Sequence, residues 1–186
     1  MVLEVNTLQG LRGNVLSMIG TFERALDVKS KRNWEKIFIA VDLHETIIRP
    51  SYDINEMAVQ FYPFALESLQ LLTKRDDVVL ILWTSSNRES ILRYHKMFQV
   101  FNVRFDFVNR NDDVPSTELA DFSEKMYMNV IIDDKAGFEA ETDWKDFYWY
   151  LAEGEYPKQT IEVTDDLFKI TLNHKPNLKI DEDEFE

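Results

Sequence analysis

The chain has 186 residues and a net charge of −13, because 34 aspartates and glutamates outnumber 21 lysines and arginines. Hydrophobic residues make up 45% of the sequence, which is enough for one packed domain and excludes a chain that is disordered throughout. The negative charge repels phosphate backbones and argues against general nucleic-acid binding. Cysteine is absent, so disulfides, thiolate zinc sites and cysteine nucleophiles are excluded.

Residues 1–33 carry apolar side chains at helical spacing, and three glycines interrupt the pattern. We expect an N-terminal helical segment here, which packs on the rest of the domain or acts as a dimerisation arm. A basic, apolar leader is not evident, and no apolar run approaches the ~20 residues that a membrane-spanning helix needs. The sequence therefore predicts a cytoplasmic protein without membrane contact.

Short apolar runs and helical patterns alternate through the middle of the chain. The apolar runs predict strands at residues 36–41, 78–83 and 128–132, and alternation of apolar and polar residues predicts a strand at 101–108. Helical spacing predicts helices at residues 56–74, 87–98 and 143–151. Strands separated by helices indicate parallel βαβ units. We therefore expect an α/β fold over residues 34–175, with a three-layer, Rossmann-like parallel sheet and flanking helices.

The last third of the chain has a different character. Residues 159–163 and 167–172 predict either two strands around a turn or one strand and an irregular tail. Residues 176–186 end in an acidic block and are expected to form a solvated tail. The aromatic residues between 144 and 150 suit core packing, with base stacking or a partner surface as the alternative.

Polar residues follow three of the predicted strands directly. Asp42 follows the first strand, Thr84 and Ser85 follow the second, and Asp133 and Asp134 follow the fourth. The carboxyl ends of parallel strands form the crevice where ligands bind. Crowded carboxylates are relieved by a hard cation such as Mg²⁺, and hydroxyl and N–H groups at a strand-to-helix turn can hold phosphate. An aspartate is also a competent nucleophile. The plainer alternatives are helix caps and turns.

The order of these motifs resembles that of the haloacid dehalogenase-like (HAD) phosphohydrolase superfamily. The matching pieces are the run from Asp42 to Thr46, Thr84-Ser85, Lys125 and Asp133-Asp134, within residues 36–153. The run 131–137, with a tryptophan shortly after it, is similar to the small 5'(3')-deoxyribonucleotidase branch. The resemblance implies a HAD-like sheet, bound Mg²⁺ and hydrolysis of a phosphomonoester through an aspartyl-phosphate.

The resemblance also implies roles for the acidic residues. Asp42 would be the nucleophile and a metal ligand, and Asp133, with Asp134, would complete the magnesium site. His44 would occupy the acid/base position and lend its backbone carbonyl to the metal. Phosphatases of the family usually have aspartate at that position. Histidine can also move protons near neutral pH, but its presence equally suits a weakened enzyme that serves as a regulatory or protein-binding module.

The phosphate-binding groups are expected from the second strand and from a lysine. By the resemblance Thr84, with Ser85, would hold the phosphate and Lys125 would neutralise the phosphoryl group. Lys96 and Lys135 are the alternatives for this cation. A receiver-like domain, which also uses acids at strand ends, is a weaker reading because the order of motifs differs.

The motifs lie too close together for a large inserted lid domain. We therefore expect a capless, open site that takes a nucleotide or another phosphorylated molecule, unless the partner in a homodimer supplies the lid. Residues 47–55 form the expected loop over the site. Arg49 in this loop is a candidate substrate contact, with an ordinary surface charge as the alternative.

Overall fold

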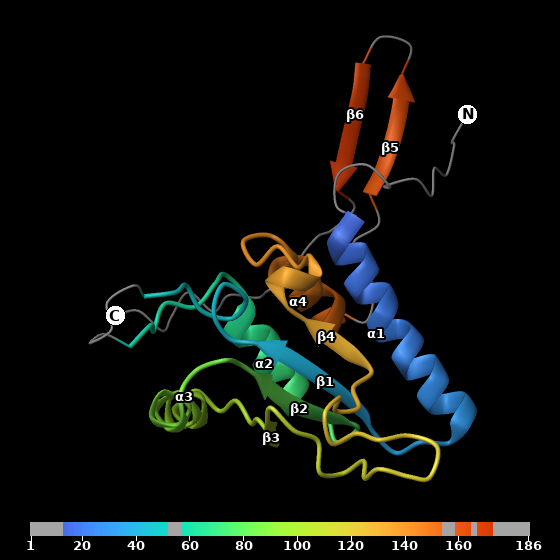
Figure 1. The fold of residues 1–186 in the computed structure, drawn as a ribbon. Helices are drawn as coiled ribbons and strands as arrows, with labels where there is room; N and C mark the ends of the chain where they lie inside the picture. The colour runs from blue at the N-terminus through green and yellow to red at the C-terminus, as the bar shows by residue number, and fades with distance from the viewer. Residues whose placement is uncertain (1–12, 52–56, 154–158, 165–166, 173–186) are drawn as a thin grey trace.

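The computed structural model describes residues 13–51, 57–153, 159–164 and 167–172, with residues 13–17 and the last two ranges described by their backbone alone. The expected acidic tail (176–186) and part of the 47–55 loop lie outside these residues. The elements are α1 (Gly13–Arg32), β1 (Ile37–Asp42), α2 (Ala65–Thr73), β2 (Val78–Trp83), α3 (Arg88–Val100), β3 (Phe107–Val108), β4 (Val130–Ile132), a 3₁₀ turn (Asp134–Ala136), α4 (Asp143–Glu153), β5 (Gln159–Thr164) and β6 (Leu167–Leu172) (Figure 1).

The four strands β1 to β4 form one parallel sheet in the order β3-β2-β1-β4. The two central strands consist almost entirely of apolar residues, half of them β-branched, as expected of strands that are buried on both faces. The predicted α/β fold with a parallel sheet and flanking helices is confirmed. The strands β5 and β6 form a separate antiparallel hairpin, which confirms the two-strand alternative for this part of the chain.

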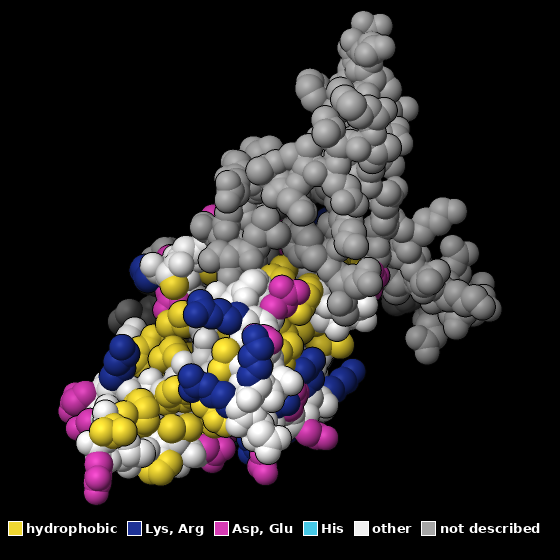
Figure 2. Space-filling view, turned by 90° about the vertical axis from the view of Figure 1, so that its right-hand side faces the viewer, with side chains coloured by type: hydrophobic (Ala, Val, Ile, Leu, Met, Phe, Trp, Pro, Cys, Tyr) yellow, Lys and Arg dark blue, Asp and Glu magenta, His cyan; other side chains and the backbone are white. Residues whose placement is uncertain are grey.

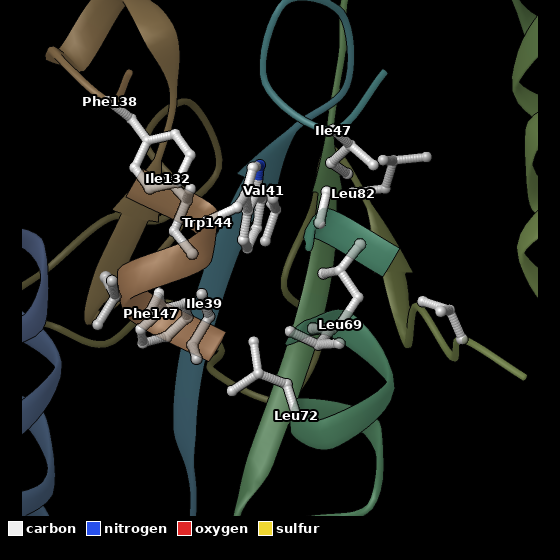
Figure 3. Packing of buried hydrophobic residues seen from close by; sticks show 14 of the residues in the cluster. Ile39, Val41, Ile47, Leu69, Leu72, Leu82, Ile132, Phe138, Trp144 and Phe147 are labelled. Carbon is white, nitrogen blue, oxygen red and sulfur yellow. The ribbon is translucent and has the colours of Figure 1, made fainter. Parts of the chain in front are cut away.

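One face of the sheet packs against the helices. The strand residues that point to this face include Ile39, Val41 and Ile132, and side chains from α1, α2, α3 and α4 join the same apolar cluster. Figure 3 shows Trp144 of α4 beside Val41 and Ile132 in this cluster. Trp144 is fully buried, and its ring meets that of Phe138 edge to face at 4.9 Å. Core packing is therefore the role of the buried part of the 144–150 aromatic cluster.

The opposite face of the sheet is covered by chain without a helix. Ala40, Val79 and Ile81 form a second, smaller cluster on this face, and the partly buried Met126 and Met128 pack on it. Both methionines belong to the irregular segment 109–129 that connects β3 to β4. Right-handed crossovers explain the arrangement, because β1-to-β2 and β2-to-β3 connections run over one face and the return to β4 runs over the other. Helices therefore cover one face and a loop covers the other.

Two predicted elements differ from those observed. The expected helix at 56–74 begins only at Ala65, because Pro63 precedes Phe64, whose φ of 64° lies in the left-handed region. The expected strand at 101–108 is reduced to β3. Its earlier residues Val103 and Phe105 instead pack into the helical-side core. The expected N-terminal helical segment is observed in its described part as α1, which runs without interruption through Gly20.

The outer side of α1 carries a mixture of charges. Figure 2 shows the side of the molecule that carries α1, where lysine and arginine side chains lie between apolar patches. Lys29 pairs with Asp77 at 3.1 Å and Lys31 pairs with Asp27 at 2.7 Å. Within the described part of the chain, the helices are too short or too polar to cross a lipid bilayer.

Candidate functional site

A cavity of about 540 Å³ lies at the carboxyl ends of the parallel strands. Strand ends contribute most of its walls, as the general rule for open α/β sheets requires. The residues that line it are Asp42, His44, Glu45, Pro50, Trp83, Thr84, Ser85, Asn109, Asp133, Asp134 and Lys135. Six of the eight residues predicted as the site therefore line one cavity, although they come from three separate stretches of the sequence.

Asp42 is the most perturbed acid of this cavity. Its carboxyl is half-buried, and burial is the largest cause that raises its pKa to about 6. The negative charges of Asp133 and Asp134 raise the pKa further, whereas hydrogen bonds from the Leu43 backbone and the Thr46 side chain oppose the shift. A carboxylate in this position is stabilised by any cation that approaches it, because the cation offsets both burial and repulsion.

Thr46 is buried and ties the ends of β1 and β4 together. Its hydroxyl oxygen accepts a hydrogen bond of 3.0 Å from the backbone N–H of Asp134 while the same side chain bonds Asp42. Its backbone oxygen accepts a hydrogen bond of 2.6 Å from the indole N–H of Trp144. This threonine therefore fixes the two acidic strand ends relative to each other and to the core.

A 3₁₀ turn directly after β4 fixes the positions of Asp133 and Asp134. The side chain of Asp133 caps this turn by accepting a 2.7 Å hydrogen bond from the backbone N–H of Lys135. The Lys135 ammonium pairs with Asp134 and lies 3.7 Å from a carboxylate oxygen of Glu45. The hydrogen bond with Asp134 is the main cause that raises the pKa of Lys135, so this side chain stays cationic.

Thr84 is held by a residue that the sequence analysis did not identify. The side chain of Asn109, directly after β3, accepts a 2.8 Å hydrogen bond from the Thr84 N–H and donates a 2.6 Å bond to its carbonyl. Asn109 has a φ of 53°, a conformation that asparagine tolerates better than most residues. The signal was available, since Asn109 follows the third predicted strand as the other site residues follow theirs.

The position of His44 is set by Tyr94 of α3. The Nε2 atom of His44 lies 3.0 Å from the Tyr94 hydroxyl. That hydroxyl also bonds the backbone of Ala58, and burial raises the pKa of Tyr94, so the phenol keeps its proton. Burial also lowers the pKa of His44 and favours the neutral ring.

Two predicted site residues do not line the cavity. Lys125 is exposed in segment 109–129, which covers the face of the sheet opposite the helices. Among the described residues, the lysine that lines the cavity is Lys135. Arg49 forms an ion pair with Glu141, and its guanidinium stacks on the Tyr62 ring at 4.6 Å from the centroid. Both placements differ from the expected contacts with a phosphoryl group or substrate.

The donor set suits a cation that needs few protein ligands. Among the described residues, no three His, Asp or Glu side chains converge closely enough to enclose a metal ion by themselves. Asp42 and Asp133 nevertheless share the cavity, and the charge of Asp133 acts on Asp42. Mg²⁺ is typically bound by one or two carboxylates and completes its octahedron with water and substrate phosphate. The residues present fit that ion better than Zn²⁺, whose protein sites are built mainly on histidine nitrogen and cysteine sulfur.

Comparisons with known proteins add little to this geometry. No protein-family model matches the chain, and no curated protein matches it. Among solved structures, a conserved protein from Bacteroides thetaiotaomicron is similar, with 28% sequence identity over 64% of this chain and 93% of that chain and a TM-score of 0.49. The functional assignment therefore depends on the site itself.

Proposed function

We propose that this protein is a Mg²⁺-dependent phosphomonoester hydrolase that works through an aspartyl-phosphate on Asp42. The observation that carries the proposal is the half-buried Asp42, whose pKa is raised to about 6 beside Asp133 and Asp134 in an open cavity. The motif order that resembles the HAD phosphohydrolases supports the same chemistry.

Asp42, His44 and Asp133 have separate roles in the proposed hydrolysis. Asp42 and Asp133, with the backbone carbonyl of His44, would hold Mg²⁺, which supplies charge neutralisation for the phosphoryl group. A carboxylate oxygen of Asp42 attacks phosphorus, and the bond to the leaving oxygen breaks, which gives an acyl phosphate and a leaving oxygen that takes a proton from His44. Water then attacks phosphorus and gives a proton back to His44, and the bond between phosphorus and the Asp42 oxygen breaks, which releases inorganic phosphate and restores the carboxylate.

Lys135 takes the place that the resemblance gives to Lys125. Its ammonium lines the cavity and is held between Asp134 and Glu45. A positive charge there can offset the charge of a phosphoryl group on Asp42. Thr84, fixed by Asn109, and Ser85 lie on the wall formed by the end of β2 and are the proposed contacts for phosphate oxygens.

A second candidate function is a catalytically weakened protein of the same fold that acts as a regulatory or protein-binding module. The observation in its favour is the neutral His44, whose Nε2 already bonds Tyr94. A neutral imidazole is a poor proton donor to a leaving group, so hydrolysis would be slow at neutral pH.

Phosphate release from p-nitrophenyl phosphate with and without Mg²⁺ tests the first candidate. The wild type should release phosphate only with Mg²⁺, and Asp42→Asn should abolish the activity while the folded structure is retained. Asp113→Asn, an exposed acid outside the cavity, is the control and should keep wild-type activity. Equal activity in Asp42→Asn and wild type would refute the proposed nucleophile.

The substitution His44→Asp separates the two candidates. If a silent wild type gains strong phosphatase activity on this change, the weakened-protein alternative is correct. If the wild type is active and His44→Asp changes its rate only a few-fold, the hydrolase is correct and the histidine is a working acid/base group.

A further inference from the structure

Trp83 places an indole ring beside the proposed nucleophile. It is the last residue of β2, it lines the same cavity as Asp42, and it is 37% exposed. Asp42 and Trp83 are register partners on neighbouring parallel strands. Paired residues on such strands lie about 4.8 Å apart and point to the same face of the sheet. The indole is therefore positioned next to the group that would accept a phosphoryl group.

Trp83 is partly exposed, whereas the residues before it on the same face of β2 are buried. Val79 and Ile81, which precede it on the same face of β2, are buried under the loop segment 109–129. Leaving a large aromatic side chain partly in water loses burial free energy that the adjacent residues gain. Pro50 is the other apolar residue of the cavity wall. The end of β2 thus offers a partly exposed apolar surface beside the proposed nucleophile.

The charges of the cavity restrict that leaving group further. Four carboxylates line the cavity, from Asp42, Glu45, Asp133 and Asp134, and Lys135 is the one lysine or arginine among the described lining residues. Its charge is already shared between Asp134 and Glu45, and Arg49 is held by Glu141. Even with a divalent cation bound, little positive charge remains for a second phosphate or a carboxylate on the substrate.

We propose that the cavity selects phosphomonoesters whose leaving group is an uncharged planar aromatic ring, and that Trp83 stacks on that ring. This inference rests on the proposed function. Offset stacking between aromatic rings adds to the burial of their surface, and it requires a flat partner. An aliphatic leaving group of similar size would bury surface but would not stack. A leaving group that carries an extra negative charge would be repelled by the carboxylates.

Binding of stable phosphonates tests the selection without turnover. Titration calorimetry of the full chain with Mg²⁺ would compare phenylphosphonate, cyclohexylphosphonate and 4-carboxyphenylphosphonate. We expect phenylphosphonate to bind about five- to tenfold more tightly than the cyclohexyl compound, because only the phenyl ring is flat. The carboxylate compound should bind more weakly than both.

The variants assign the preference to one residue. Trp83→Ala should remove the preference for the phenyl over the cyclohexyl ring, and Trp83→Phe should keep most of it. Trp34→Ala is the matched control, because Trp34 lies outside this cavity. Equal affinities in the wild type, failure of every phosphonate to bind, or a preference that survives Trp83→Ala would each overturn the inference.

Hydrolysis and binding measurements together show whether the ring selection or the proposed hydrolase has failed. If phenyl phosphate is hydrolysed with Mg²⁺ but Trp83→Ala changes the KM for aryl and alkyl phosphates equally, the inference is wrong and the hydrolase stands. If phenylphosphonate binds with the Trp83-dependent preference but no phosphate ester is hydrolysed, the hydrolase is wrong and the binding selection stands.

Discussion

The two faces of the parallel sheet differ in what covers them. The face toward the helices buries a large continuous apolar cluster, with Trp144 and Phe147 fully enclosed. The face toward segment 109–129 has a cluster of three buried strand residues under partly buried methionines. Successive residues of a strand alternate between these faces. The helical face therefore supplies most of the stability, and the loop-covered face has room for a site.

Because of this alternation, Asp42 and Trp83 belong to the face of the sheet that segment 109–129 covers. Asp42 follows Phe38 and Ala40 in the two-residue period of β1, and Trp83 follows Ile81 in that of β2. Beyond the last covering side chains, these two residues open into the cavity. A one-residue shift in either strand would move the side chain into the helical core. We therefore expect substitutions on the helical face to alter chiefly stability and substitutions at the cavity to alter chiefly activity.

The largest expected effect on stability comes from the helical face. Trp144→Ala removes a fully buried indole and its hydrogen bond to Thr46, and should lower the free energy of unfolding by about 3–5 kcal/mol. Trp144→Phe keeps most of the packing and should cost less, because it chiefly removes the hydrogen bond. Urea unfolding measures both. A loss below about 1 kcal/mol for Trp144→Ala would contradict the assigned role of this face.

A smaller effect, on activity, is expected at the end of β3. Asn109→Ala removes both hydrogen bonds to the Thr84 backbone and should reduce phosphate release by about tenfold, or ~1.4 kcal/mol. Asn102→Ala is the control, since Asn102 has a similar φ of 56° but lies outside the cavity. Both variants carry the same backbone strain, so an equal loss of activity in the two would show that strain, not Thr84 positioning, is responsible.

Packing on the loop-covered face should contribute less than packing on the helical face. Met128→Ala is expected to cost about 1 kcal/mol, because the side chain is only partly buried on a small cluster. Leu69→Ala, a fully buried residue of α2, should cost about 2–5 kcal/mol in the same urea experiment. Equal losses for the two variants would remove the proposed difference between the faces.

The smallest expected effect is a pH dependence of stability in the absence of metal. Because burial raises the pKa of Asp42 from 3.8 to about 6, the folded state holds a proton that the unfolded state has already released within this window. The contribution of Asp42 to stability therefore falls as the pH rises from 3.8 to about 6 and stays low above it. Asp42→Asn should remove this decrease and stabilise the metal-free protein at pH 7 by on the order of 1 kcal/mol, less than the full shift implies because water reaches the carboxyl.

Urea unfolding of the metal-free wild type and Asp42→Asn at several pH values measures this difference. Asp76→Asn, an exposed acid before β2, provides the control and should leave the pH dependence of the wild type in place. If Asp42→Asn is no more stable than the wild type at pH 7, then the Asp42 carboxylate is not destabilised by its surroundings as described.

The sequence predicted the parts of the fold that depend on short-range patterns. The apolar runs of β1 and β2 indicated buried parallel strands, and the rule for strand ends brought Asp42, Thr84 and Asp133 to one cavity. The predicted start of α2 is too early. Phe64 adopts a left-handed backbone conformation directly before the helix, and the spacing of apolar residues does not reveal that conformation.

The contacts that depend on the path of long loops could not be predicted. The choice between Lys125 and Lys135 depends on where the connection from β3 to β4 runs, and spacing along the sequence does not fix that path. The sequence offers Arg49 as a candidate substrate contact or an ordinary surface charge, and it does not reveal the partner Glu141, which lies 92 positions away. Asn109 could have been predicted as a site residue, since it directly follows a predicted strand.

The most direct test of the account is the binding of Mg²⁺ itself. Titration calorimetry of the wild type should show one ion bound, and Asp42→Asn and Asp133→Asn should each weaken that binding at least tenfold, because both carboxylates would share the ion. Asp113→Asn should bind as the wild type does. If both site variants bind Mg²⁺ with wild-type affinity, or the wild type binds none, the two carboxylates do not form a magnesium site and the proposed hydrolase is wrong.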